Sequence, residues 1–250
     1  MKQDLEEKVV TKDKLKITVQ PKTKKELEDI IKKTIEEKGD SCDLNFINTS
    51  LITDMSGLFL GSSFNGNISK WDTSNVENMS EMFANSEFNG DISDWNTSNV
   101  VDMSCMFMTS DFNGDISKWN TSNVQDMSEM FCGSSFEGDI SKWNVSKVES
   151  MREMFAESLL FDGDISNWDV SNVDDMYSMF WASVFNGNLS KWNVSKVIDM
   201  RSMFAESEFN CDISGWNVSK EALLYGMFER TYLEENNNLP DWYVCHPNKD

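Results

Sequence analysis

The chain has 250 residues, 39% of them hydrophobic, which is enough for a folded core and argues against a chain that is disordered throughout. No apolar run approaches the roughly 18 residues of a membrane-spanning helix, so the sequence predicts no membrane span. The formal net charge is −21, and such an acidic surface repels phosphate backbones, so nucleic acid is not an expected partner.

Residues 1–43 are predicted to form an N-terminal cap made of one strand and one helix. The strand is the stretch LKITVQ at 15–20, and the helix is TKKELEDIIKKTIEEK at 23–38. The apolar residues of this helix fall on one side of it: Leu27, Ile30, Ile31 and Ile35. A helix of this kind is suited to cover the open end of a stack. The first residues show no apolar signal-peptide region, which leaves an intracellular location open.

Residues 44–230 consist of about eight copies of one unit. The phrase FNGDISKWN at 112–120 returns as FNGNISKWD at 64–72 and as FEGDISKWN at 136–144. Seven tryptophans share one position of the unit and are spaced 24, 24, 24, 25, 24 and 24 residues apart: Trp71, Trp95, Trp119, Trp143, Trp168, Trp192 and Trp216. So regular a period is typical of a solenoid, in which each coil contacts only its neighbours.

Two patterns inside the unit predict a strand followed by a short helix. In ISKWNTS, Trp119 and Thr121 fall on one face of a strand. In NVQDMSEMF, the apolar residues from Val124 to Phe131 have helical spacing, and the serine before them is interpreted as a helix N-cap. Glycines such as Gly114 are interpreted as turn residues with positive φ. The expected fold class is therefore an α/β solenoid that is leucine-rich-repeat-like.

The large apolar side chains are confined to a few positions of the unit. Of 16 phenylalanines, 15 lie in two columns, 14 of 16 methionines lie in two more, and seven of nine tryptophans lie in another. Stacked coils superimpose these columns as continuous ladders, so we expect them to form the core rather than an aromatic ligand site.

Residues 231–250 are predicted to form a C-terminal cap and tail, with NNNLPDWYVC closing the chain around Trp242. Atypical terminal units keep a solenoid soluble by covering its open ends. With both ends covered, the expected state is a monomer.

The sequence offers little for catalysis. The five cysteines share no repeat column and form no CxxC pair, so they are expected to be free thiols, and the single histidine is His246. A few side chains depart from the repeat without forming a recognisable nucleophile–base or paired-carboxylate pattern: Cys105, Cys132, Arg152, Tyr177, Trp181 and Arg201. We therefore predict that the protein is not an enzyme and uses no cofactor.

One column carries carboxylates in most coils: Asp91, Asp115, Asp139, Asp164 and Asp212. We expect these side chains to accept hydrogen bonds from turn amides, because their spacing matches no calcium-binding loop. A calcium-binding repeat remains the alternative interpretation of this column.

The outward positions of the predicted strand face carry most of the lysines of the repeat region. These define the candidate binding residues: Lys70, Lys118, Lys142, Lys147, Lys191 and Lys196. Glutamates such as Glu129 and Glu153 are expected on the opposite, helix side. A rigid face with repeated lysines fits a non-catalytic scaffold that binds a protein or glycan partner. The alternatives are a structural, self-assembling repeat protein or a chain whose lysines only maintain solubility.

The repeat resembles that of the BspA-like leucine-rich-repeat surface proteins of bacteria. The segment that carries this resemblance is FEGDISKWNVSKVESMREMF at 136–155, and the likeness extends over about residues 14–243. It implies a solenoid on the cell surface or secreted, and a role in adhesion to host or matrix proteins. From the residues themselves we expect no metal site and no catalytic residue.

Overall fold

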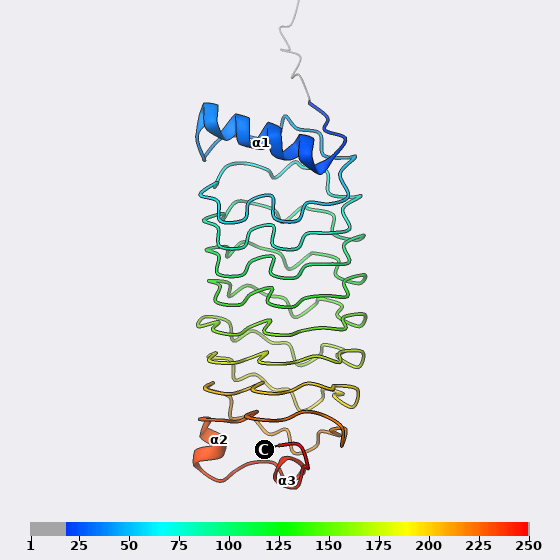
Figure 1. Ribbon diagram of the computed structural model, residues 1–250, viewed down its shortest axis with the longest axis vertical. Coiled ribbons are helices and arrows are strands. Elements are labelled where there is room, and N and C mark those ends of the chain that lie inside the picture. The colour runs from blue at the N-terminus through cyan, green and yellow to red at the C-terminus, as the bar shows by residue number, and fades with distance from the viewer. Residues whose placement is uncertain (1–18, 250) are drawn as a thin grey trace, which may run out of the picture.

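The computed structural model describes residues 19–249 as one stack of coils with helices only at its two ends (Figure 1). Helix α1 spans Lys24–Lys38, α2 spans Tyr232–Glu235 and α3 spans Asp241–Val244. Isolated parallel bridges join each coil to the next at a spacing of 24 or 25 residues: Asp54 to Asn78, Asn78 to Asp102, Asp102 to Asp126, Asp126 to Ser150, Ser150 to Asp175, Asp175 to Asp199, and Asp199 to Leu223. The predicted solenoid and its period are confirmed.

The strand and short helix expected in each coil are absent from residues 19–249, where the coils consist of linked turns. In the expected strand, the Trp119 amide donates to the Ile116 carbonyl at 3.1 Å, which closes a turn. In the expected helix, Glu129 has a φ of 56°. Right-handed helices require negative φ, so a residue of this kind stops a helix from continuing. The α/β detail of the expected fold is therefore not confirmed for the coils.

Asp and Asn side chains set most of the turns. The Asp115 carboxylate accepts the Ser117 amide at 2.9 Å, and the Asn120 side chain accepts the Ser122 amide at 3.1 Å. Each coil thus uses the short pattern Asp/Asn-x-Ser repeatedly, with a buried residue in the middle. These bonds offer the backbone an alternative to strand and helix ladders. The N-cap interpretation is also wrong in the described coils, because no helix begins after these serines.

Left-handed residues recur at two positions of each coil, four residues apart. In one coil they are Glu81 and Asn85, with φ of 57° and 53°, and in the coil before it they are Gly57 and Gly61. Amides of alternate residues in this segment donate to the next coil, for example from Glu81 to Ser104 at 2.8 Å. We call the surface formed by this segment in successive coils the turn-ladder face. It replaces the expected helix side.

The repeated apolar columns form one continuous core. The Trp71 and Trp95 rings stack with centroids 6.4 Å apart, and the Phe83 and Phe107 rings with centroids 5.8 Å apart. All seven repeated tryptophans are 4% exposed. Each indole nitrogen donates to a carbonyl of the preceding coil, as Trp119 does to Ile92 at 3.1 Å. The prediction that these columns are core is confirmed.

The glycines of the repeated phrase have a different role from the one expected. Gly138 does not belong to the glycines with positive φ, so the expectation of a left-handed turn was wrong there. A Cβ atom at Gly138 would instead lie 2.7 Å from the ring of Phe136. Glycine fits in this coil because the buried ring of the residue two positions earlier occupies that space. The same column holds Cys211 in the last copy of the phrase.

Both ends of the stack are covered. The side chains of Leu27 and Ile31 on α1 are buried in the core cluster, and the Thr23 side chain caps the helix by accepting the Glu26 amide. At the other end the Trp242 ring stacks on Trp216 with centroids 6.1 Å apart. Of the predicted N-terminal strand, residues 15–18 lie outside the described residues, and Val19 pairs in parallel with Ile47.

Candidate interaction surface

Four of the six candidate lysines lie in one exposed column. Each follows the serine of an Asp/Asn-Ile/Leu-Ser turn and precedes a buried tryptophan, and the four are Lys70, Lys118, Lys142 and Lys191. The turn bonds on one side and the buried indole on the other fix where each lysine leaves the backbone. The expected outward orientation is therefore confirmed for these residues, although no strand carries them.

The other two candidates, Lys147 and Lys196, lie in a separate column five residues further along the coil. Their ammonium groups donate to Asn123 and Asn172 of the preceding coil, both at 2.7 Å. In most other coils this position holds an asparagine whose side chain donates to a backbone carbonyl one coil earlier, as Asn99 does to Ser74 at 2.7 Å. The six lysines therefore lie in two columns. The four of the first column are exposed, and the ammonium groups of the second column are hydrogen-bonded to asparagines of the preceding coil.

Carboxylates accompany the lysines along the surface. Hydrogen bonds from the Ser93 hydroxyl and amide hold the pKa of Asp91 below its ordinary value, and Lys70 lowers that pKa further. The pKa of Asp139 is lowered in the same way by Ser141 and, to a smaller degree, by Lys142. The lysine face is consequently a mixed surface of alternating charge. The expectation that the aspartates accept turn amides is confirmed at these positions.

The departures from the repeat gather on the turn-ladder face. Arg152, Tyr177 and Arg201 are separated by 25 and 24 residues, which are the repeat periods at these coils, so all three occupy one column. The Arg152 guanidinium lies 4.0 Å from the centre of the Tyr177 ring, and Arg201 lies 5.3 Å from it. From the sequence, these side chains were examined only as possible catalytic residues. Their common column was the signal that they form a single cluster.

The cysteines and the single histidine contribute to the structure and show no feature of a reactive site. All five cysteines are free, as predicted. Burial raises the pKa of Cys105 to about 12 and that of Cys132 to about 11, so both thiols are protonated at neutral pH and are weak nucleophiles. The His246 ring is 2.9 Å from the Ser219 carbonyl oxygen and accepts the Asn248 amide at 3.2 Å, which ties the C-terminal segment to the last coil.

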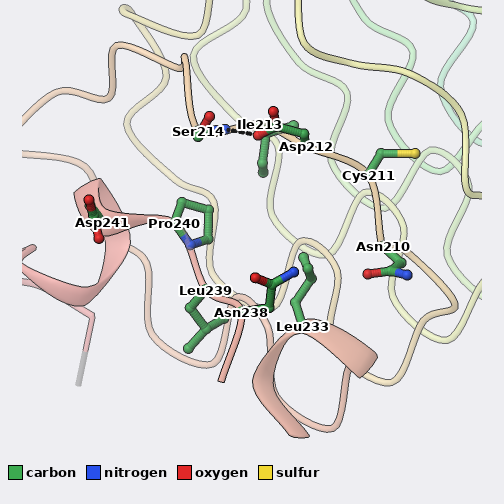
Figure 2. A pocket seen from close by; sticks show the side chains of 10 residues that line it. All are labelled: Asn210, Cys211, Asp212, Ile213, Ser214, Leu233, Asn238, Leu239, Pro240 and Asp241. Carbon is green, nitrogen blue, oxygen red and sulfur yellow. Dashed lines mark hydrogen bonds between the residues drawn. The ribbon is translucent and has the colours of Figure 1, made fainter. Parts of the chain in front are cut away.

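A pocket of about 400 Å³ separates the last coil from the C-terminal cap (Figure 2). One wall is the segment from Asn210 to Ser214, where Asp212 accepts the Ser214 amide at 2.9 Å. The other wall comes from α2 and the segment that leads to α3. The nearest thiol, Cys211, has its pKa raised by burial and points its sulfur at the Asn186 carbonyl at 3.1 Å. The pocket is the space between a regular coil and an irregular cap.

The described residues contain neither a metal-binding cluster nor a helix fit to cross a membrane. No group of three or more His, Cys, Asp or Glu residues between 19 and 249 has the arrangement of a metal site. Over the same residues, no helix combines the length and the apolar character that crossing a bilayer requires.

Comparison with known proteins identifies a repeat family. A family model described as "Mycoplasma protein of unknown function, DUF285" matches residues 26–134, 108–206 and 181–248. The three overlapping matches run from α1 through all the coils to the C-terminal cap. No curated protein and no solved structure matches the chain significantly.

Proposed function

The chain belongs to the DUF285 family, and we propose that it is a non-catalytic binding scaffold whose lysine-bearing face contacts a protein or glycan partner. The observation that carries this proposal is the exposed column of Lys70, Lys118, Lys142 and Lys191, repeated on a backbone whose turns are fixed by side-chain hydrogen bonds. A surface held rigid before binding loses little conformational entropy when a partner docks.

The partner of this face carries acidic groups. The lysine tips are exposed cations on a body that otherwise repels acidic molecules, so they select the side on which such a partner docks. Because aspartates alternate with the lysines, a partner with spaced acidic groups fits better than a uniformly acidic one. The resemblance to BspA-like surface proteins supports a location on the cell surface or outside the cell, and adhesion as the role.

A structural, self-assembling role is the second candidate. It requires that the apolar end of one stack dock on the end of another. The ends are covered by α1 and by the Trp242 segment, which favours the binding scaffold over assembly by stacking.

The test uses a charge reversal on the lysine face. We expect Lys118→Glu combined with Lys142→Glu to weaken binding to an acidic probe, either an oligoglutamate peptide or a sulfated glycan, without lowering the melting temperature. The loss shrinks as salt rises, because exposed charges separated by more than about 8–10 Å are screened. The matched control is Glu129→Lys combined with Glu153→Lys on the turn-ladder face, which should not weaken binding. The opposite pattern would mean that the acidic partner docks on the turn-ladder face and not on the lysine face.

A further inference from the structure

One column of the turn-ladder face changes character halfway along the stack. In the first half of the stack the column contains only serine, at Ser56, Ser80, Ser104 and Ser128. In the second half it alternates arginine and tyrosine, at Arg152, Tyr177, Arg201 and Tyr225. None of the four bulky side chains belongs to the buried core: Tyr225 is 63% exposed, and the other three are partly exposed. A scaffold needs none of them.

These side chains are held in place before any partner arrives. The Arg152 and Arg201 guanidiniums approach the Tyr177 ring from the coil before and the coil after. Arg152 also pairs with Glu153 at 3.2 Å, and Arg201 donates to both oxygens of Asp199. Tyr177 is therefore clamped between two guanidiniums, and each guanidinium is fixed by a carboxylate. Tyrosine and arginine are among the residue types enriched at binding hot spots.

A hollow lies beside the clamped tyrosine. It has a volume of about 200 Å³, and its lining combines two aromatic rings, one carboxylate and two hydroxyls: Glu153, Tyr177, Ser178, Trp181 and Ser202. Trp181 is partly exposed, in contrast to the seven repeated tryptophans of the core. Its column holds alanine in three other coils, at Ala84, Ala156 and Ala205. The indole is thus an addition to the surface that the coil does not need for packing.

We propose that this hollow binds a lysine or arginine side chain from a basic segment of a partner protein. An indole face attracts a cation, and a neighbouring carboxylate strengthens that attraction. The lining supplies Trp181 and Glu153, and the incoming cation would share the Glu153 carboxylate with Arg152, which pairs with it at 3.2 Å from outside the lining. The net charge of −21 draws a basic partner toward the molecule, and the hollow determines where one of its side chains docks. This site is separate from the lysine face and selects a partner of opposite charge.

The test is a calorimetric titration of the full chain with an oligoarginine peptide. Trp181→Ala should weaken binding roughly tenfold, the size expected for loss of a partly desolvated cation–π contact. The variant should fold, because alanine is native to that column. Met108→Ala is the matched control, since Met108 occupies the same column three coils before Trp181, and it should leave the affinity unchanged.

Two further comparisons separate a site from general attraction between opposite charges. Glu153→Gln should weaken binding more than Glu81→Gln, which removes the same charge from the same column far from Trp181. Equal losses for these two variants, or for Trp181→Ala and Met108→Ala, would overturn the proposal. A neutral oligosaccharide that binds the wild type and not Trp181→Ala would overturn the class of partner. Lys118→Glu combined with Lys142→Glu should not weaken peptide binding. The proposal for this hollow and the proposal for the lysine face can therefore be contradicted independently of each other.

Discussion

At the scale of single residues, each repeated tryptophan is fixed in two ways. The Trp143 ring stacks on Trp119 with centroids 6.5 Å apart, and its indole nitrogen donates to the Ile116 carbonyl at 3.1 Å. Trp143→Ala should therefore lower the free energy of unfolding by about 3–5 kcal/mol, as large-to-small core substitutions do. Trp242→Ala should cost less, because Trp242 is only partly buried in the cap. Urea denaturation measures both, and an unchanged Trp143→Ala midpoint would remove this column from the core.

Glycine has opposite effects in two columns of the repeat. Gly138→Ala should destabilise the protein by about 1–3 kcal/mol, because the new methyl group overlaps the buried Phe136 ring. Glu81→Gly should stabilise it by about 0.5–1 kcal/mol, because Glu81 has a φ of 57°, which costs little only for glycine. Glu81→Ala removes the same charge and keeps the strain, so it should give no such gain. Thermal unfolding compares the variants, and equal effects of Ala and Gly at Glu81 would contradict the strain argument.

The sequence predicted which residues are buried better than it predicted their backbone. Large apolar side chains have one low-energy place in a stack, so the columns of Trp, Phe and Met were sufficient to identify the core. The sequence did contain a signal for the left-handed columns, and it was missed. Gly57, Gly133 and Gly226 have positive φ and occupy positions that hold Glu or Ser in other coils. The glycines of the repeated phrase led to a wrong prediction of positive φ. Glycine is also used where another group packs too closely for a Cβ atom, and that is its role here.

At the scale of the structural element, the turn aspartates make stability depend on pH. Hydrogen bonds from serine lower the pKa of Asp115 and of Asp139 from an ordinary value of 3.8. A lowered folded-state pKa gives stability that is present above the unfolded pKa and is lost as the pH falls through the folded one. Asp115→Asn with Asp139→Asn should therefore lower the melting temperature at neutral pH, and the difference from wild type should vanish in acid well below pH 3.8. A difference that persists there would exclude the carboxylate charge as its cause.

Calcium should have no effect on these turns. Each aspartate already accepts a serine amide through its Oδ1, and the Asp91 Oδ1 also accepts the Ser93 hydroxyl at 2.7 Å, so one oxygen of each carboxylate is engaged within its own turn. No group of three or more possible ligands gathers among the described residues. We expect millimolar calcium and excess chelator to give the same melting temperature. Stoichiometric binding in a calorimetric titration, with a matching rise in melting temperature, would show that the column is a calcium site.

The turns themselves were beyond sequence reasoning for a physical reason. A serine amide near an Asp or Asn side chain fits both a helix N-terminus and an isolated turn, and the choice depends on contacts with neighbouring coils. The exposure of Lys70, Lys118, Lys142 and Lys191 could be predicted because it depends only on which neighbours are buried. The cluster of Arg152, Tyr177 and Trp181 was missed because its meaning lies in contacts between coils.

At the scale of the whole molecule, the surface has two distinct parts, the lysine column and the turn-ladder face. The lysine column and the turn-ladder face follow different segments of every coil, and each runs along the length of the stack. A stack of this kind transmits little change from one coil to distant coils, because each contacts only its neighbours. The two proposed sites are therefore expected to act independently, and the state of the ends decides whether the molecule remains a single stack.

The N-terminal helix should keep the molecule monomeric. Leu27 is fully buried and Ile31 is 4% exposed where α1 covers the first coil. Leu27→Asp with Ile31→Asp places two charges in that contact, which unseats the helix and exposes the apolar end of the stack. Light scattering over a concentration series should show a constant mass for the wild type and a rising mass for the variant. The exposed pair Lys33→Asp and Glu37→Lys, on the outer side of the same helix, should leave the mass constant. A wild type whose mass rises with concentration would instead favour assembly as the function, because its ends would then join without being uncovered.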